Sequence, residues 1–537
     1  MEEIIVNVSE GLLRGKVSRN YKNGQFYSFF GIPYALPPLD ELRFKPPQPP
    51  KRWEGIRDAT RERNGCISRH SLFRKVEGSE DCLLLNVYSP MTLSTNNVLK
   101  PVMVWIHGGL FVMGSATTDL YGPEFLLTQD IVLVTVNYRL GALGFLCLED
   151  TSLGVTGNNG LRDIIMALKW INLNIKVFYG DPKNVTLFGG SSGGACVHYL
   201  MLSPIVKDLF HKVILHGGSA LNFWANGDRS SARKLADVLG LASGSDKEIL
   251  EFLRQQPIQT LYDGQTKILK GNSPHIQLHF CPVIEKVSPI ITPVITENPA
   301  EIIASGQYNR VPMMMGLSSS EGNIFEYKIK NIVKSNSKAV LVPNFEHLIP
   351  YDMNIPADTP LSRYTADKIK SFYFNGEEPI LTKHRNAFYE VLGDAFFNYK
   401  LTDAAVKHLD TLTCPIYFFI FSVDGEFNFL RPHRLPGATH NEDLFYLFKV
   451  GCKVNKIVEN SLEDITIQRM VKLWTNFAKF GNPNSDDFKD INWKPIEPTK
   501  LHYLDIGENL TVGVNPKYER FIFWDKIYKM HLLPGKM

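Results

Sequence analysis

Short apolar runs and longer mixed segments alternate along the chain, and their spacing predicts a sheet covered by helices. Residues 101–106 and 185–188 are apolar and partly β-branched, which is typical of buried strands. The runs at 311–315 and 415–421 have the same character. From about residue 84 to about residue 218, such runs alternate with helical segments, as a mostly parallel sheet requires. The chain is therefore expected to adopt an α/β fold.

Three segments outside those runs predict what surrounds the sheet. Residues 228–256 are charged and helix-forming, and we expect them to form a cap over it. Residues 343–382 are rich in Pro, Asn and Lys and predict a second, loop-heavy insertion. Residues 466–481 have the apolar spacing of an amphipathic helix, with Trp474 and Phe477 on its inner face.

A glycine-rich pentapeptide lies where a predicted strand passes into a predicted helix. Its central residue is Ser191, flanked by Gly189 and Gly193. A serine hydroxyl becomes a nucleophile only when it is exposed, aimed and given a base. A sharp strand-to-helix turn supplies the exposure and the aim, and only small neighbours fit around it. An ordinary glycine-rich turn is the alternative in a chain with 40 glycines, so the order of the other motifs decides.

A second glycine-rich turn follows the strand at 101–106 and predicts an oxyanion hole. Glycine lets backbone N–H groups approach a substrate carbonyl without a side-chain collision. The predicted donors are the N–H groups of Gly108, Gly109, Leu110 and Ser192. A plain turn at the end of a strand is the alternative.

A candidate acid and a candidate base follow the serine in the chain. Glu321 comes after the apolar run at 311–315, and His440 lies in a loop beyond the run at 415–421. The acid would hold the imidazole in the correct tautomer, and the imidazole would take the serine proton. Either residue alone would be interpreted as a solvated side chain. Four motifs at strand ends, in the order serine, acid, histidine, predict a catalytic triad.

Length and composition set limits on the remaining classes of function. The three triad candidates lie far apart in sequence and must converge, so residues 1–537 are predicted to form a single domain. A formal charge of +3 is too weak to indicate a nucleic-acid partner. The chain contains no uninterrupted apolar stretch of about 18 residues, so no transmembrane helix is expected. The Cys and His residues lack ligand-type spacing, so neither a metal nor an organic cofactor is expected.

Four further motifs carry a resemblance that spans nearly the whole chain. They are Phe30–Ala35, Ser79–Tyr88, Asn137–Gly141 and Gly157–Asp163. With the serine, acid and histidine motifs, they resemble the carboxylesterase/cholinesterase family, the type-B carboxylesterases, and within it the insect intracellular enzymes. The resemblance implies an α/β-hydrolase fold, in which helices flank a mostly parallel central sheet and cap regions cover an active-site gorge. It also implies hydrolysis of carboxylic esters through an acyl-enzyme.

The same resemblance implies several structural pairs. Arg43 with Glu80, and Arg139 with Asp163, would be the buried ion pairs of the family. Cys66 and Cys82 occupy the positions of its first disulfide. The count of seven cysteines is odd and the second disulfide of the family is absent, which favours a reducing compartment. The oxidation state of the remaining pair stays open.

Location is predicted from the beginning of the chain. Residues 1–6 lack the basic and apolar regions of a signal peptide, which predicts a cytoplasmic protein. A secreted protein whose signal had been removed would look the same.

Two hydrophobic segments are predicted to line a substrate pocket. Phe111 and Trp224 are candidates for the substrate pocket, although a core tryptophan is an equal alternative for Trp224. The segment 67–81 lacks the tryptophan that cholinesterases use to hold a quaternary ammonium, so choline esters are not expected. Gly190 stands where the family commonly has glutamate, or glutamine in juvenile hormone esterases, and Leu110 and Ser192 also depart from the family pattern.

The prediction is a serine carboxylesterase of broad range, acting on xenobiotic or lipid esters as small-molecule substrates. A slow scavenger of organophosphates and other xenobiotics is one alternative. A non-catalytic binding member of the same fold is another, although such members typically lose the serine or the histidine. We expect a monomer or a weak homodimer.

Overall fold

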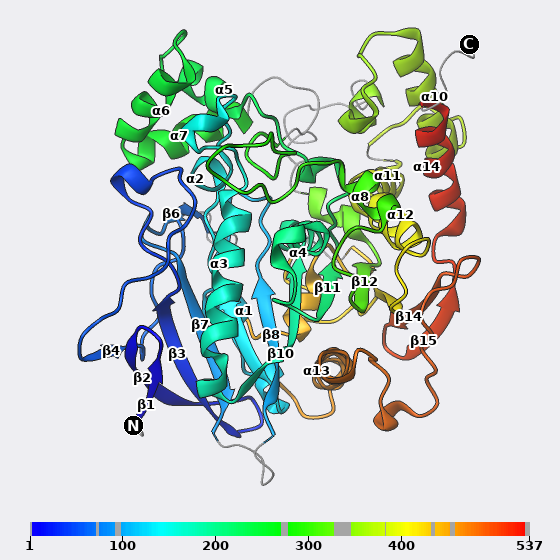
Figure 1. Ribbon diagram of the computed structural model, residues 1–537. Helices are drawn as coiled ribbons and strands as arrows, with labels where there is room; N and C mark the ends of the chain where they lie inside the picture. The colour runs from blue at the N-terminus through cyan, green and yellow to red at the C-terminus, as the bar shows by residue number, and fades with distance from the viewer. Residues whose placement is uncertain are drawn as a thin grey trace.

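The computed structural model describes residues 3–531, apart from 71–74, 92–97, 270–277, 327–344, 382, 431–434 and 452–456. A mixed sheet runs through the centre of the molecule, with helices on both sides (Figure 1). The strands are β1 Glu3–Val8, β2 Gly11–Arg19, β3 Gln25–Pro33, β4 Ile56–Asp58, β5 Ser68–Arg69, β6 Val76–Glu77, β7 Leu84–Pro90, β8 Lys100–Ile106, β9 Val132–Val136, β10 Gly180–Gly190, β11 Lys212–His216, β12 Met313–Ser318, β13 Ile416–Phe421, β14 His502–Ile506 and β15 Leu510–Val514. The helices are α1 Thr118–Tyr121, α2 Gly141–Phe145, α3 Asn159–Asn174, α4 Ser192–Leu202, α5 Ser231–Val238, α6 Asp246–Gln255, α7 Ile258–Leu269, α8 Pro299–Ser305, α10 Pro360–Phe374, α11 Arg385–Gly393, α12 Tyr399–His408, α13 Leu462–Phe480 and α14 Tyr518–His531.

The strand order confirms the predicted α/β architecture. The large sheet runs β1-β2-β3-β7-β9-β8-β10-β11-β12-β13-β14-β15. Every neighbouring pair from β9 through β14 is parallel, and the pairs at the two ends of the sheet are antiparallel. Because parallel strands carry helices on both faces, the central strands are apolar throughout rather than alternating.

The strand β8 shows how the apolar runs build two cores. All seven of its residues are buried. Successive side chains of a strand point to opposite faces. Val102 and Val104 accordingly pack into the cluster on one face of the sheet, and Met103 and Trp105 pack into the cluster on the other.

Outside the sheet, two of the three segment predictions are confirmed and one is wrong. The segment 228–256 contains α5 and α6, and α13 buries Trp474 and Phe477 completely. The segment 343–382 is not loop-heavy in its described part, because α10 occupies Pro360–Phe374. A capping box at the start of α10 satisfies free backbone N–H groups of its first turn. A proline, Pro360, occupies that first turn, where its fixed φ suits a helix. Residues 343, 344 and 382 lie outside the described residues.

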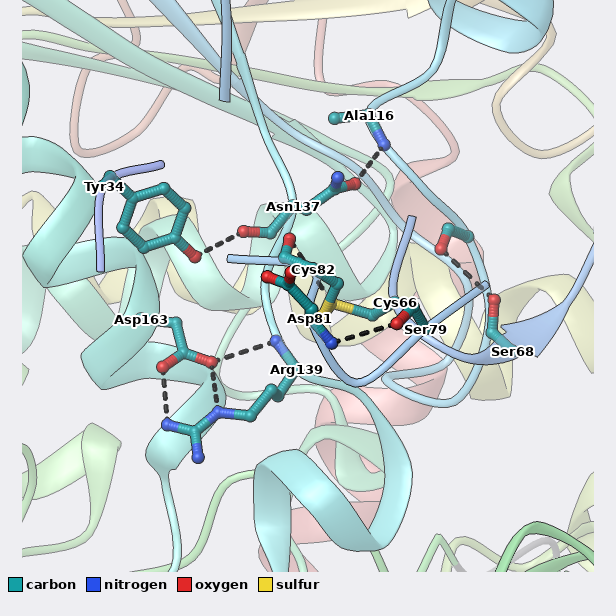
Figure 2. Close-up of a disulfide and its surroundings, with 11 residues drawn as sticks. Tyr34, Cys66, Ser68, Ser79, Asp81, Cys82, Ala116, Asn137, Arg139 and Asp163 are labelled. Atoms are coloured by element: carbon teal, nitrogen blue, oxygen red, sulfur yellow. Dashed lines mark hydrogen bonds and ion pairs between the residues drawn. A yellow bond between two sulfur atoms is a disulfide. The ribbon is translucent and has the colours of Figure 1, made fainter. Parts of the chain in front are cut away.

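The predicted ion pairs and the cysteine pair are all present near the start of the chain. Arg43 Nε donates to Glu80 at 2.8 Å, and Arg139 Nε donates to Asp163 at 2.8 Å. Figure 2 shows the second pair beside the disulfide that joins two cysteines, Cys66 and Cys82. Burial raises the pKa of Asp163, and the Arg139 guanidinium opposes that rise. In the described part of the chain, no helix has the length and apolar character needed to cross a membrane.

Candidate active site

Ser191 occupies a sharp turn between β10 and α4, at the carboxyl end of the central sheet. Its φ of 55° and ψ of −122° lie outside the ordinary regions for an L-residue. The turn is so tight that a Cβ on Gly189 would lie 2.5 Å from the carbonyl carbon of Gly193. The N–H of Ser191 donates to the carbonyl of His216 at 2.7 Å, which fixes the turn to the neighbouring strand β11. The strained elbow expected from the pentapeptide is present.

The turn after β8 lies directly against Ser191. A Cβ on Gly108 would lie 2.5 Å from the carbonyl oxygen of Gly190 and 3.1 Å from Cβ of Ser191. Gly109 has a φ of 122°, which a side chain would make costly. Within the described residues, no hydrogen bond uses the backbone N–H groups of the four predicted oxyanion donors. These four are Gly108, Gly109, Leu110 and Ser192.

Two departures from the family pattern have local physical explanations. A Cβ on Gly190 would lie 2.8 Å from Leu444 and 3.3 Å from Trp105, so a longer side chain there would have to displace Leu444. The Ser192 hydroxyl is fully buried and accepts the N–H of Phe111 at 3.3 Å. It therefore ties the glycine turn after β8 to the start of α4. Leu110 keeps a left-handed φ of 56° and an exposed fraction of 37%.

Glu321 and His440 come together at the carboxyl ends of β12 and β13. Nδ1 of His440 faces Oε2 of Glu321, and both side chains are buried. The other carboxylate oxygen of Glu321 accepts the N–H of Ser318 at 2.7 Å. Nε2 of His440 is buried and has no hydrogen-bond partner among the described residues. A neutral imidazole bonded to a carboxylate through Nδ1–H keeps Nε2 as a free acceptor.

Two consecutive glycines bring the histidine and the serine to the same place. A Cβ on Gly217 would lie 2.9 Å from Cε1 of His440. A Cβ on Gly218 would lie 2.0 Å from the carbonyl oxygen of Ser191. The histidine ring and the serine backbone thus pack against neighbouring residues of one turn after β11, as a triad requires.

Aromatic rings line one side of His440, and one of them was not anticipated from the sequence. Phe397 stacks on the His440 ring with centroids 4.0 Å apart. Phe397 belongs to a π-helical turn, Asp394–Asn398, that joins α11 to α12. Such turns are frequent at functional sites, but the sequence carries no marker for one.

The two predicted pocket residues belong to the same aromatic group. Phe111 and Trp224 are both buried, with ring centroids 6.3 Å apart, and Trp224 also contacts Phe397 at 6.1 Å. The indole N–H of Trp224 donates to the carbonyl of Phe396 at 2.7 Å. Trp224 therefore presents only its apolar surface, and its role in binding substrate stays a prediction.

A second histidine–carboxylate pair lies beside the first and was also missed by the sequence analysis. Nδ1 of His216 faces Asp443, and the indole N–H of Trp474 donates to Nε2 of His216 at 3.0 Å. All three side chains are buried. Asp443 is 227 positions away from His216 in the chain, so no local pattern could have joined them.

Comparisons with known proteins agree on one family. The carboxylesterase family profile matches residues 2–524. The chain is 32% identical to a juvenile hormone esterase of Tribolium castaneum, with 96% of this chain and 90% of that protein covered. It is 33% identical to esterase E4 of Myzus persicae, with 91% and 88% covered.

The same family is found among solved structures. The crystal structure of juvenile hormone esterase from Manduca sexta, with OTFP covalently attached, superimposes with a TM-score of 0.87 at 30% identity. The match covers 98% of this chain and all of that one. The chain belongs to the carboxylesterase family, has the α/β-hydrolase fold, and is a carboxylic ester hydrolase.

Proposed function

We propose that this protein hydrolyses carboxylic esters through an acyl-enzyme formed on Ser191, with His440 as the base and Glu321 as the acid. The observation that carries the proposal is the free Nε2 of His440, whose other ring nitrogen is bonded to Glu321. An unpaired buried acceptor is costly, and a serine proton is what would satisfy it during turnover.

The chemistry follows from these positions. His440 Nε2 takes the hydroxyl proton as Ser191 Oγ attacks the ester carbonyl carbon. Negative charge develops on the carbonyl oxygen, and the unpaired N–H groups of the turn after β8 and of Ser192 stabilise it. His440 then gives the proton to the leaving alcohol. Water, deprotonated by the same imidazole, attacks the acyl-enzyme and releases the acid.

The aromatic group around Phe111 and Trp224 supports an apolar, size-limited acyl pocket. Because the indole N–H of Trp224 is taken by a backbone carbonyl, the pocket offers no polar handle to the acyl chain. We infer a broad range of uncharged esters, of xenobiotic or lipid origin, with discrimination by size. Juvenile hormone is a necessary test substrate, because similar proteins carry it in their names.

The test is stopped-flow hydrolysis of p-nitrophenyl esters from acetyl to octanoyl. The wild type is expected to show a burst followed by steady turnover, and Ser191→Ala is expected to lose about 10⁴-fold or more. Ser243→Ala is the matched control, since that serine is exposed. A burst with almost no turnover would support the scavenger alternative. Equal activity in Ser191→Ala and wild type would overturn the proposal.

The cysteine pair bears on where the protein is located. The disulfide between Cys66 and Cys82 is typical of an oxidising compartment, so it supports the secreted alternative over the cytoplasmic prediction. A monomer or weak homodimer stays a prediction, which sedimentation of the purified protein would test.

A further inference from the structure

The turn that carries Glu321 is held by three separate parts of the chain. The N–H of Ser319 donates to Phe421 at the end of β13 at 2.8 Å. The hydroxyl of Ser319 accepts the N–H of Ala438, from the loop that carries His440, at 3.0 Å. The carbonyl of Ser319 accepts a hydrogen bond from Nζ of Lys517 at 2.8 Å. The third contact comes from the far end of the chain.

Lys517 immediately precedes α14, which Figure 1 shows along the outer edge of the molecule near α10 and α12. The residue as a whole is partly exposed, but its ammonium end is enclosed. Burial lowers the pKa of Lys517 to about 8, and the neighbouring Arg520 lowers it as well. Three carboxylates oppose that change, from Asp394, Glu321 and Glu390.

Two of those three carboxylates already have another cation. Arg520 pairs with Glu390 and with Asp394, at 3.2 Å in each case. Asp394 also accepts the hydroxyl of Tyr373 at 2.6 Å. The third carboxylate, Glu321, faces Nδ1 of His440.

A cavity of about 160 Å³ lies behind the acid and is partly open to solvent. Its lining includes Glu321, Lys517, Arg520 and Asn398. Oδ1 of Asn398 is buried without a hydrogen-bond partner among the described residues. A polar cavity of this size holds several water molecules. The cavity also gives a small solute room to reach the position of the Lys517 side chain.

We propose that Lys517 is a positioning residue for the acid of the proposed triad. Its ammonium group fixes the Ser319 carbonyl and so the turn that aims Glu321. Glu321, Asp394 and Glu390 face it from the elements η7 (Glu321–Phe325), the π-helical turn and α11, and Arg520 faces it from α14. The proposal rests on the proposed function.

The first test compares kcat and KM in wild type, Lys517→Met and Lys517→Arg. The kcat of Lys517→Met should fall about 3- to 10-fold with little change in KM, because the acid is less well aimed. Lys517→Arg keeps a cation and should restore kcat. An unchanged kcat in the folded Lys517→Met protein would overturn the proposal.

Chemical rescue separates the missing ammonium from a general loss of structure. Ethylammonium added to Lys517→Ala is expected to enter the cavity and recover most of the lost kcat. Lys517→Met fills that space with its own side chain and is the matched control that ethylammonium should not rescue. Potassium at the same ionic strength corrects for salt. No rescue of a folded Lys517→Ala, or equal rescue of both variants, would overturn the proposal.

The two proposals fail in different ways. Activity retained by Ser191→Ala would remove the proposed function, and this inference with it. Full loss in Ser191→Ala, together with wild-type behaviour in Lys517→Met, would remove only the inference.

Discussion

Two buried histidine–carboxylate pairs lie next to each other in this protein, and a single contact distinguishes them. In the pair of His440 and Glu321, Nε2 of the histidine has no partner among the described residues. In the pair of His216 and Asp443, Nε2 accepts the indole N–H of Trp474. Because a neutral imidazole has one donor and one acceptor nitrogen, the second ring has nothing left for chemistry. The same pairing thus yields a candidate base in one place and a structural brace in the other.

The brace connects the two parts that the candidate base must bring together. The carbonyl of His216 accepts the N–H of Ser191, and Asp443 lies three positions after His440 in one loop. The bond between His216 and Asp443 therefore ties the strand beside the serine to the loop of the histidine.

The largest expected effect compares the two histidines directly. His440→Gln should lower kcat/KM about 10⁴-fold or more, because the proposed mechanism transfers the serine proton to His440. His216→Gln should keep activity within about tenfold and lower the free energy of unfolding by about 1–3 kcal/mol. Steady-state kinetics and urea unfolding of both variants check this. Similar losses of activity in the two folded variants would erase the distinction.

The two carboxylates give the next largest contrast. Glu321→Gln should lower kcat about 10³- to 10⁴-fold, since an amide can donate to Nδ1 and select the wrong tautomer of His440. Asp443→Asn should have a small effect on kcat, because the Trp474 N–H fixes the tautomer of His216 from the other side. An Asp443→Asn variant as impaired in kcat as Glu321→Gln would show that the indole contact does not hold the ring.

Other buried histidines make the stability of the protein depend on pH. His198 accepts the N–H of Ala220 at 3.1 Å and bonds His408 at 2.8 Å through the two Nε2 atoms, which keeps both rings neutral. Burial lowers the pKa of His198 to about 3 and of His107 to about 4, and lowers the pKa of His408 well below its usual value.

The sign of the pH effect follows from these depressed values. Below about pH 6.5 these histidines bind protons in the unfolded chain but stay neutral in the native state. Their contribution to the free energy of unfolding is therefore complete above pH 6.5 and is lost as pH falls toward about 4. Each histidine contributes a slope of about 1.4 kcal/mol per pH unit in that window. Urea unfolding at several pH values measures it, and His408→Gln should reduce the slope. An unfolding free energy that stays flat between these pH values would contradict the assignment.

The smallest effect isolates the indole contact itself. Trp474→Phe leaves Nε2 of His216 buried and unpaired, and should cost about 1–3 kcal/mol beyond the lost packing. Trp493→Phe is the matched control, because Trp493 is equally buried and its indole N–H has no partner among the described residues. The difference between the two variants in urea unfolding gives the value of the contact. Equal losses of unfolding free energy in the two variants would show that the Trp474 contact does not stabilise His216.

Features that depend on a short local pattern could be predicted from the sequence, and features that depend on tertiary packing could not. The elbow of Ser191 and the glycine turn at Gly108 each combine a strand end with small residues, so a short pattern suffices. Glu321 and His440 were found from their positions after predicted strands and from the order serine, acid, histidine along the chain. Lys517 gave no signal, because its partner Ser319 lies 198 positions earlier.

The prediction that residues 343–382 are loop-heavy was wrong for a related reason. Pro and Asn lower the average helix propensity of 343–382, but Thr359 and Ser362 cap the helix locally and Pro360 fits its first turn. The average composition of a long segment hides the few capping residues that start the helix. The capping pattern itself was readable from the sequence.

The π-helical turn between α11 and α12 places a narrow limit on how this chain can change length. The two helices run on through that turn as one continuous rod, and each residue of an α-helix rotates the chain by about 100°. Deleting one residue within 394–398 would let the rod relax to regular α-helix, and Phe397 would swing away from the His440 ring. Homologous exchange or loop trimming in this enzyme must therefore treat these five positions as an indivisible unit, although they carry no catalytic group.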